Sequence, residues 1–235
     1  MPDKLESPAA VIFDMDGVLV NSNPFHVEKW AEFLTKRHIP FDTATLPAQI
    51  LGQRNDHIFR LFFGPEMSAQ EMNRLEEELE ENFRQAIGPH AKPLDGLETL
   101  IRELSAARVP MAVASSATRE NIDFILDALR FRSFFRTVMS GDEVHKPKPH
   151  PEIYLKTAEK LGVQPAACVA FEDSFVGVEA VKAAGMKCVA IASTFSAQQL
   201  RARTSADRVE SDFCSVSLPV LRSLFSRDGQ HARYD

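Results

Sequence analysis

The stretch that most constrains this chain runs from residue 11 to residue 20 and reads Val-Ile-Phe-Asp-Met-Asp-Gly-Val-Leu-Val. Its first three residues form a short apolar run, which is typical of a strand buried in a parallel sheet. The run ends at Asp14, and Asp16 and Gly17 follow closely. In open α/β sheets the carboxyl ends of the strands face the ligand crevice, so both carboxylates are placed for chemistry. On this stretch alone a simple turn is the alternative, because Asp and Gly are common turn residues.

The second half of the chain alternates apolar runs with helical patterns. Short strands are predicted at 111–114, 137–139, 168–171, 188–191 and 207–209, and apolar stripes at helical spacing lie between them. Strands separated by helices of this length predict a parallel sheet covered on both sides through right-handed crossovers. We therefore expect an α/β fold with a Rossmann-like, doubly wound parallel sheet.

Residues 24–88 carry helical patterns and no strand pattern. The first helix is expected to start with Asn23 as N-cap and Pro24 in the first turn, the second spans 55–63, and the third follows a capping box that Ser68 opens. The acidic run Glu76 to Glu81 is interpreted as a solvated helix face, and 88–94 as a linker. We expect a small all-helical cap, residues 23–92, inserted into an α/β core formed by residues 1–22 and 93–235.

Composition narrows the class of partner. The chain has 235 residues, of which 44% are hydrophobic and 26% charged, and its formal net charge is -6. These values are ordinary for a globular protein and leave no basic excess for nucleic acid or an anionic membrane, so small molecules fit better. No run reaches 18 apolar residues, and residues 1–10 do not resemble a leader. The three cysteines show no CxxC spacing. We expect a soluble protein in the reducing cytoplasm, a monomer in preference to an oligomer, and a mobile polar tail over residues 226–235.

Three of the predicted strands end in polar residues that are far apart in the sequence. Asp14 and Asp16 follow the first, Ser115 follows the second, and Glu172 and Asp173 follow another. Because carboxyl ends of parallel strands lie at one edge of the sheet, these side chains are expected to meet. Carboxylates that cluster repel one another unless a cation neutralises them, and an all-oxygen set suits Mg²⁺.

A lysine is expected at the same place. Lys148 sits between Pro147 and Pro149, and prolines on both sides limit where its side chain can point. A hydroxyl, loop amides and a lysine beside a metal ion would hold a phosphoryl group and its charge.

These residues resemble the four motifs of the haloacid dehalogenase-like hydrolase superfamily. The motifs occur in the right order over nearly the whole chain, as Asp14-Met15-Asp16-Gly17, Ser115 after an apolar strand, Lys148-Pro149-His150-Pro151, and Glu172-Asp173-Ser174. The helical insert directly after the first motif resembles the small cap of the branch that includes phosphoglycolate phosphatases and β-phosphoglucomutases. The resemblance implies a Mg²⁺-dependent enzyme that acts on a small phosphorylated metabolite.

The resemblance also implies roles. Asp14 would attack phosphorus and form an aspartyl-phosphate, and Asp16 would protonate the leaving oxygen and then activate water. Ser115 and Lys148 would hold the phosphoryl oxygens, with Ser116 as a further phosphate-binding candidate. Mg²⁺ would be held by Asp14, the backbone carbonyl of Asp16, Glu172 and Asp173. Dehalogenases of this superfamily lack an acid at the position of Asp16, so carbon–halogen cleavage is not expected.

Alternatives remain for several of these residues. Ser115 or Ser116 could instead cap the following helix, Lys146 could take the role of Lys148, and Glu172 could support the metal ligands without contacting the metal ion. In the cap, His26, Arg54 and Asn55 are tentative substrate contacts. A lone His or Trp on such a helix is more often a packing residue, but His26 and Trp30 both align with positions that help close the cap in β-phosphoglucomutase-like sequences. Arg119, near the Ser115 loop, could contact phosphate or face solvent.

Three functions compete at this stage. The first is a phosphatase for a sugar or polyol phosphate, and the second is a phosphosugar mutase of the β-phosphoglucomutase type. The third is a non-catalytic switch that becomes phosphorylated on Asp14, although such a domain needs neither the insert nor an acid at position 16. Hydrolysis is favoured over mutase activity because this chain has Leu51 and Asn55 where the mutases carry a lysine and an arginine, and Ala117 and Thr118 where they carry a polar Ser-Lys pair.

Overall fold

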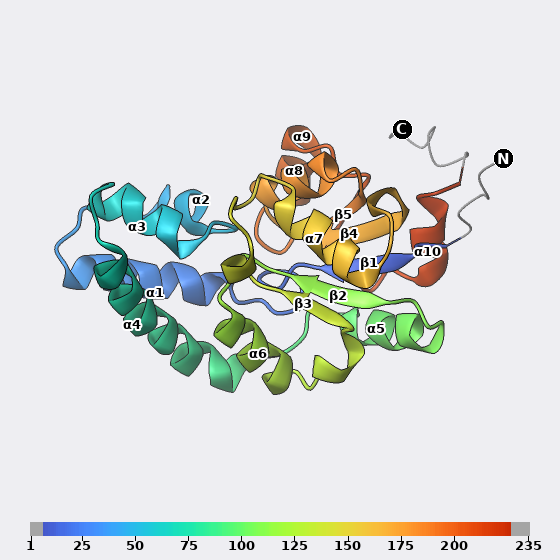
Figure 1. The fold of residues 1–235 in the computed structure, drawn as a ribbon, viewed down its shortest axis with the longest axis horizontal. Helices are drawn as coiled ribbons and strands as arrows, with labels where there is room; N and C mark the ends of the chain where they lie inside the picture. The colour runs from blue at the N-terminus through green and yellow to red at the C-terminus, as the bar shows by residue number, and fades with distance from the viewer. Residues whose placement is uncertain (1–6, 227–235) are drawn as a thin grey trace.

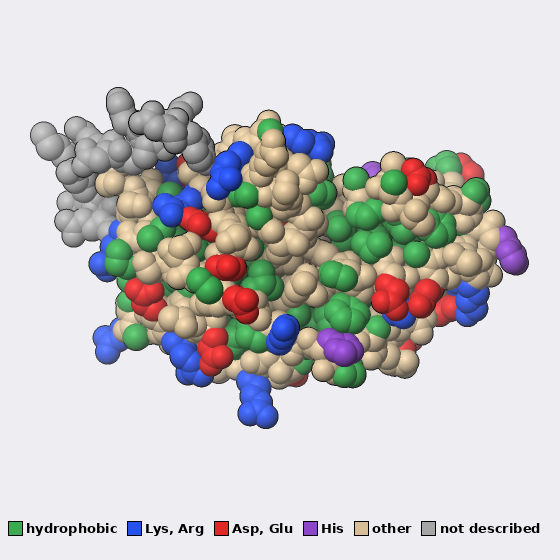
Figure 2. All heavy atoms as spheres, turned by 180° about the vertical axis from the view of Figure 1, so that it is seen from behind, with side chains coloured by type: hydrophobic (Ala, Val, Ile, Leu, Met, Phe, Trp, Pro, Cys, Tyr) green, Lys and Arg blue, Asp and Glu red, His purple; other side chains and the backbone are tan. Residues whose placement is uncertain are grey.

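The structure is a computed structural model that describes residues 7–226 (Figure 1). Residues 1–6 and nearly all of the predicted polar tail, 226–235, lie outside the described residues. No helix in the described part is both long and apolar enough to cross a membrane. On the face shown in Figure 2, acidic and basic side chains are interspersed without a large patch of one sign.

A six-stranded sheet forms the centre of the fold, in the order β3-β2-β1-β4-β5-β6. Every neighbouring pair is parallel. The strands are β1 (Ala10–Phe13), β2 (Met111–Ala114), β3 (Thr137–Met139), β4 (Cys168–Glu172), β5 (Lys187–Ile191) and β6 (Arg208–Glu210). The chain builds outward from β1 to β3 and then returns to the other side of β1 with β4. The order therefore reverses next to β1, which is where open α/β sheets place their ligand crevice.

Helices cover both faces of the sheet (Figure 1). Apolar side chains of α5 (Leu97–Ala106), α6 (Arg119–Ala128) and α10 (Leu218–Ser223) belong to one core cluster. Those of α7 (Glu152–Leu161), α8 (Phe175–Ala183) and α9 (Ala197–Arg203) belong to the other. Short 3-10 turns complete the connections at η1 (Gly88–His90), η2 (Arg132–Phe134), η3 (Gly141–Glu143) and η4 (Pro165–Ala167).

Strand β1 shows how the sequence places this core. Successive side chains of a strand point to opposite faces, so Val11 and Phe13 enter one cluster while Ala10 and Ile12 enter the other. The Phe13 ring stacks on Phe171 of β4 with ring centroids 5.0 Å apart. All four residues of β1 are fully buried. The predicted doubly wound parallel α/β fold is confirmed.

The segment after β1 consists of four helices, α1 (Asn23–Lys36), α2 (Leu46–Ile50), α3 (Asn55–Phe63) and α4 (Ala69–Ile87). They share a separate apolar cluster that includes Trp30, Phe33, Phe59, Leu75 and Leu79. Helix α2 is absent from the sequence-based prediction because it has only five residues, too few to show a helical period.

Two local predictions about this insert are wrong. The N-cap of α1 is Ser22, not Asn23, and its side chain makes no capping hydrogen bond. The acidic run is not a uniformly solvated face, since Glu80 is only 6% exposed and Glu76 is half-buried. The predicted cap at Ser68 is present, with the hydroxyl accepting from the Glu71 amide at 3.2 Å.

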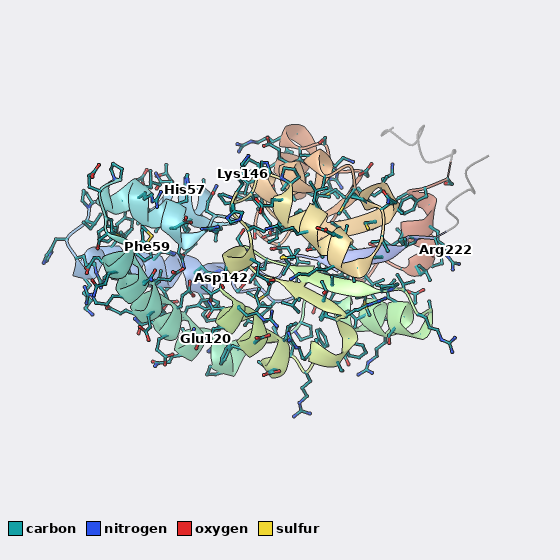
Figure 3. The ribbon with its side chains drawn as sticks, viewed as in Figure 1. His57, Phe59, Glu120, Asp142, Lys146 and Arg222 are labelled. Atoms are coloured by element: carbon teal, nitrogen blue, oxygen red, sulfur yellow. The ribbon has the colours of Figure 1, made fainter. Side chains whose placement is uncertain are left out.

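Phe59, which Figure 3 labels on α3, is fully buried, and its ring contacts Trp30 and Phe33. We therefore expect Phe59→Ala to destabilise the insert by about 3–5 kcal/mol. Leu61→Ala on the same helix is the matched control, since Leu61 is 51% exposed and its loss should cost less than about 0.5 kcal/mol. Urea unfolding followed by circular dichroism measures both. Equal midpoint shifts for the two variants would contradict the assignment of this core.

Candidate active site

The carboxyl ends of β1, β2 and β4 meet at one cavity between the sheet and the insert. The cavity has a volume of about 110 Å³. Asp14, Ser115 and Lys148 line it from the sheet side, and His26 and Asn55 line it from the insert. The sheet edge and the insert thus share one cavity, and the side chains of the strand ends meet at its sheet side as the strand-end pattern predicted.

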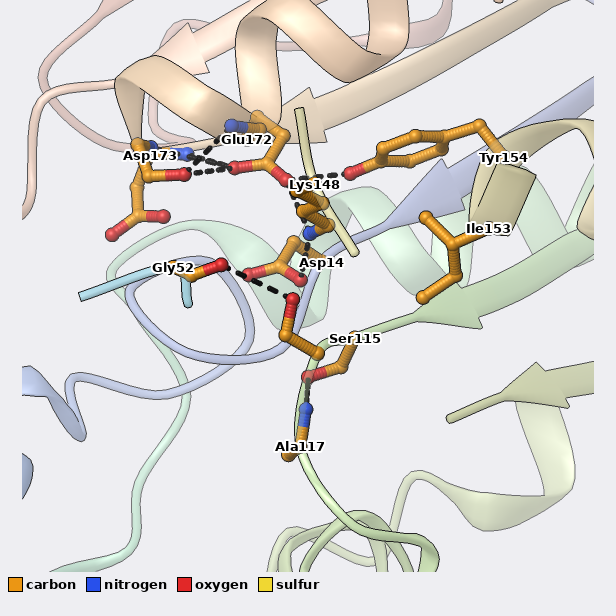
Figure 4. Close-up of polar contacts among 12 residues, drawn as sticks. Asp14, Gly52, Ser115, Ala117, Lys148, Ile153, Tyr154, Glu172 and Asp173 are labelled. Atoms are coloured by element: carbon orange, nitrogen blue, oxygen red, sulfur yellow. Dashed lines mark hydrogen bonds and ion pairs between the residues drawn. The ribbon is translucent and has the colours of Figure 1, made fainter. Parts of the chain in front are cut away.

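Lys148 is the centre of an ion-pair network at this edge (Figure 4). Its ammonium Nζ lies 2.8 Å from Oδ1 of Asp14 and 2.5 Å from Oε1 of Glu172. The Tyr154 hydroxyl donates to the same Glu172 oxygen at 2.6 Å. All four side chains are buried. Buried charges persist only when they are paired and hydrogen-bonded, so the lysine is fixed in place by the carboxylates that it neutralises.

Glu172 has no carboxylate oxygen without a donor. Its Oε1 takes Lys148 and Tyr154, and its Oε2 accepts from the amides of Asp173 and Ser174 and from the Ser174 hydroxyl. Gly177 lies against this carboxylate so closely that a Cβ there would be 2.0 Å from it. These contacts let Glu172 orient Lys148, whether or not it also contacts a metal ion.

Asp173 is held on the opposite side of the cluster. Its Oδ2 accepts from the Asn23 amide at 2.8 Å and from the Thr194 hydroxyl. Ligand oxygens of Asp14, Glu172 and Asp173 all lie within 4.8 Å of one another, and all three residues are buried. Oxygen donors at this spacing fit a hard divalent cation such as Mg²⁺.

The electrostatics support that fit. Burial and the neighbouring Glu172 and Asp16 charges raise the pKa of Asp14 to about 8, against the opposing effect of Lys148. Burial, with Glu172 and Asp14 nearby, also raises the pKa of Asp173 well above its usual value. Without a second cation the cluster holds more negative charge than Lys148 can offset. A divalent cation would remove this repulsion.

Asp16 has a different environment. Its Oδ1 accepts from the Ser22 hydroxyl at 2.5 Å and lies 3.2 Å from Nε2 of His26. The His26 ring stacks on Phe83 with ring centroids 3.8 Å apart. Although burial opposes ionisation of both groups, their interaction lowers the pKa of Asp16 and raises the pKa of His26. The second carboxylate is therefore coupled to a proton-bearing side chain of the insert.

The serines of the β2 loop divide their contacts. Ser115 is buried beside the network, and its hydroxyl accepts from the Ala117 amide at 3.1 Å. Ser116 lines the cavity, but its hydroxyl donates to the Gly52 carbonyl of the insert at 3.1 Å. Of the two competing lysines, Lys148 enters the cluster, whereas Lys146 is exposed (Figure 3).

The loop between α2 and α3 closes the cavity against the sheet. Gly52 has φ +78°, and a Cβ there would lie 2.8 Å from the Ser174 hydroxyl. Next to it, Arg54 pairs with Asp56 at 2.8 Å and donates to the carbonyls of Gly141 and Val144 at 3.2 and 2.8 Å. Arg54 thus lies at the cavity but is already engaged in holding the loop.

The remaining two candidates, Asn55 and Arg119, differ in where they lie. Asn55 lines the cavity and donates to Glu76 at 3.1 Å and to Glu80. Arg119 is exposed and pairs with Asp123 at 2.8 Å, so its side chain is directed along its own helix.

Sequence reasoning missed several side chains that organise the site. Tyr154 reads as an apolar helix position, Asn23 as a cap, and Thr194 as a loop residue, and none belongs to the four motifs. One signal was available for Tyr154, which stands six residues after Lys148 and in the first turn of the helix that Pro151 opens. No local pattern pointed to Asn23 or Thr194, because their role depends on chain segments about 150 and 21 residues away from Asp173.

Known proteins are similar to this chain in sequence. Residues 11–191 match the haloacid dehalogenase-like hydrolase family. A fructose-1-phosphate phosphatase of Escherichia coli is 31% identical over 78% of this chain and 96% of its own length. A validoxylamine A 7'-phosphate phosphatase of Streptomyces hygroscopicus subsp. limoneus is 28% identical over 89% and 96%.

The fold is shared as well. A β-phosphoglucomutase structure from Clostridium difficile superimposes with a TM-score of 0.80 at 23% identity, over 93% of this chain and 97% of that one. With the sequence match spanning the first motif to β5, the chain belongs to the haloacid dehalogenase-like hydrolase family, in the branch with a helical cap.

Proposed function

We propose that this protein is a Mg²⁺-dependent phosphatase that hydrolyses a small phosphorylated sugar or polyol through an aspartyl-phosphate on Asp14. The reaction class, phosphoric monoester hydrolysis, rests on the family and on relatives that are named phosphatases. The observation that supports the mechanism most is the pairing of Lys148 with Asp14 at 2.8 Å beside a second carboxylate, Asp16.

In the first step Asp14 attacks phosphorus. Lys148 holds Oδ1, and among the described residues no side chain donates to Oδ2, which leaves that oxygen for bond formation. The bond from phosphorus to the ester oxygen breaks as the new one forms, and Asp16 supplies the proton that the leaving oxygen takes. His26, 3.2 Å away, is placed to pass a proton to Asp16 beforehand.

In the second step water displaces Asp14 from phosphorus. Asp16, now ionised, removes a proton from that water, and the products are inorganic phosphate and free Asp14. Ser115 and Lys148, which both line the cavity, would hold the phosphoryl oxygens. Asp14 and Asp173, together with the Asp16 carbonyl and Glu172, would hold Mg²⁺. The bound cation would offset negative charge on the phosphoryl group in the transition state.

The chain is proposed to consist of a cap and a core. We propose that residues 23–92 form the cap and that residues 1–22 and 93–235 form the core, which the separate apolar cluster of the insert supports. Hydrolysis is proposed instead of mutase activity, because Arg54 is engaged with Asp56 and two carbonyls and Arg119 lies outside the cavity lining. The cytoplasm remains the proposed location, consistent with cysteines that are all free.

We expect Asp14→Asn to reduce phosphate release from every ester by at least about a thousandfold, because the nucleophile is gone while the shape is kept. A panel of phosphorylated metabolites and p-nitrophenyl phosphate, assayed with Mg²⁺, measures this and identifies substrates. Retention of activity within tenfold of wild type would refute Asp14 as nucleophile. If wild type releases no phosphate from any ester, the phosphatase proposal fails.

Asp16→Asn should distinguish good leaving groups from poor ones. Loss of the acid should slow an alkyl phosphate by about 10²–10⁴-fold and p-nitrophenyl phosphate much less, because p-nitrophenolate departs without a proton. The rate of phosphoenzyme formation, measured by rapid quenching, should be compared between the two esters for wild type and variant. Equal losses on both esters would count against Asp16 as the acid.

Metal binding should change the free energy of unfolding. In EDTA, the free energy of unfolding of wild type should fall as pH rises from about 4 to about 8. The reason is that folded Asp14, with its pKa raised to about 8, keeps a proton that the unfolded chain has lost. Mg²⁺ at 100 times its Kd should restore about 2.7 kcal/mol at pH 8.

Asp173→Asn should weaken both effects, since it removes one charge and one ligand from the cluster. Its melting temperature in EDTA should exceed that of wild type at pH 8, and Mg²⁺ should add little. Asp207→Asn is the matched control, because Asp207 pairs with Lys182 and lies outside the cavity lining. Identical Mg²⁺ titrations for wild type and Asp173→Asn would exclude Asp173 as a ligand.

A further inference from the structure

The end of the cavity that belongs to the insert has a composition of its own. We call it the cap-side pocket and define it by Trp30 of α1, Asn55 of α3, and Glu76 and Glu80 of α4, all of which line the cavity. It lies in the same cavity as Asp14, Asp16 and Lys148. A phosphate ester whose phosphoryl group reaches Asp14 would therefore extend its carbon skeleton toward these four residues.

The polar groups of this pocket are fixed before any ligand enters. Glu80 accepts from Asn55 through one oxygen and from Asn121 through the other, and Arg84 donates to the Asn121 carbonyl at 2.9 Å. Asn55 also donates to Oε1 of Glu76 at 3.1 Å. Among the described residues nothing donates to Oε2 of Glu76, so this carboxylate keeps an acceptor for a ligand.

Trp30 supplies an independent sign that a ligand binds here. The side chain is 2% exposed and lines the cavity, yet its indole N–H has no acceptor among residues 7–226. In that part of the chain, every side-chain nitrogen and oxygen that solvent cannot reach has a hydrogen-bond partner. The Trp30 N–H has none there, so it must be accessible to solvent. Because Trp30 lines the cavity and its N–H has no acceptor in the described part of the protein, this donor is free for water or for an acceptor group of a bound molecule.

The charges around the pocket exclude a second anion. The basic residues of the cavity lining are Lys148, Arg54 and His26, and each faces a carboxylate of the protein. Two further acids, Asp56 and Asp142, line the same space, and Figure 3 shows Asp142 where the sheet meets the insert. Glu76, Glu80, Asp56 and Asp142 thus place four acids along the cavity lining beside Asn55 and Trp30.

On the basis of the function proposed above, we propose that the cap-side pocket is a specificity site for the uncharged hydroxyl groups of a polyol or sugar monophosphate, and that it rejects substrates with a second phosphate or a carboxylate. Hydroxyls can donate to Glu76 and accept from Trp30, which uses both open groups of the pocket. A second phosphate or a carboxylate on the substrate cannot donate a hydrogen bond to Glu76 and would be repelled by its negative charge. No free cation of the described cavity lining would pair with that group.

Matched substrate pairs test this with the wild-type enzyme. Each pair differs only by a terminal CH₂OH in place of a carboxylate: glycerol 3-phosphate with 3-phosphoglycerate, erythritol 4-phosphate with 4-phosphoerythronate, and sorbitol 6-phosphate with 6-phosphogluconate. We expect kcat/KM to favour the uncharged member at least tenfold in every pair that is turned over. Equal values, or a preference for the carboxylate, would overturn the proposal.

The test separates this inference from the proposed function. p-Nitrophenyl phosphate reports phosphoryl transfer without hydroxyls or a second charge. If this ester is hydrolysed but none of the six metabolites is, the specificity site is refuted while the phosphatase stands. If neither is hydrolysed with Mg²⁺ present, the phosphatase itself is refuted and the specificity site with it.

Glu76→Gln tests the proposed role of the Glu76 carboxylate, because it removes the charge with little change of shape. Relative to p-nitrophenyl phosphate, kcat/KM for the preferred polyol phosphate should fall at least tenfold, and the preference over its carboxylate partner should shrink by a similar factor. Glu77→Gln is the matched control, because Glu77 is exposed on the same helix and does not line the cavity, and it should leave both ratios within twofold of wild type. A melting temperature for each variant confirms folding. Unchanged ratios in folded Glu76→Gln would remove Glu76 from the site.

Discussion

Burial of several carboxylates at the end of β1 is the constraint on which the rest of this structure depends. Asp14, Glu172 and Asp173 offer oxygens within 4.8 Å of one another in a setting that water barely reaches. Lys148 offsets part of their charge, and the proposed divalent cation would offset the remainder. The parallel sheet supplies this geometry, since only its shared edge brings residues 14 and 173 together. Tyr154 and the amides around Glu172 hold the carboxylate that fixes Lys148, and Asp14 keeps one oxygen without a side-chain donor among the described residues.

The helical insert completes what the sheet edge begins. It brings His26 to Asp16, Gly52 to the loop after β4, and Arg54 to carbonyls of the loop after β3. Closing the cavity removes water from charged groups, which strengthens every electrostatic interaction within it. The two sides also divide the work. The sheet carries the groups proposed to act on phosphorus, and the insert carries Glu76, Glu80 and Trp30, which would choose the molecule that bears the phosphate.

The sequence predicted the parts of this structure that depend on local pattern. The apolar run of β1 and the boundaries of β2 and β3 agree with the structure, and so does α3, because strand and helix periods are written in neighbouring residues. What failed depends on distant contacts. Asn23 looks like an N-cap, but its amide is taken by Asp173, 150 positions away. Glu80 looks like surface within an acidic run, but Asn55 and Asn121 from other helices make its burial possible. No local pattern records such partners.

The central claim is that Asp14 becomes phosphorylated during turnover. Its most direct test is to mix wild-type protein with p-nitrophenyl phosphate and Mg²⁺, quench with acid within the first turnovers, and map the modified peptide by mass spectrometry. We expect one phosphoryl group on the peptide that contains residues 11–20, located on Asp14 and lost when the quench is delayed until substrate is exhausted. Rapid phosphate release with no phosphorylated Asp14 at any quench time, or with the group on another residue, would contradict it.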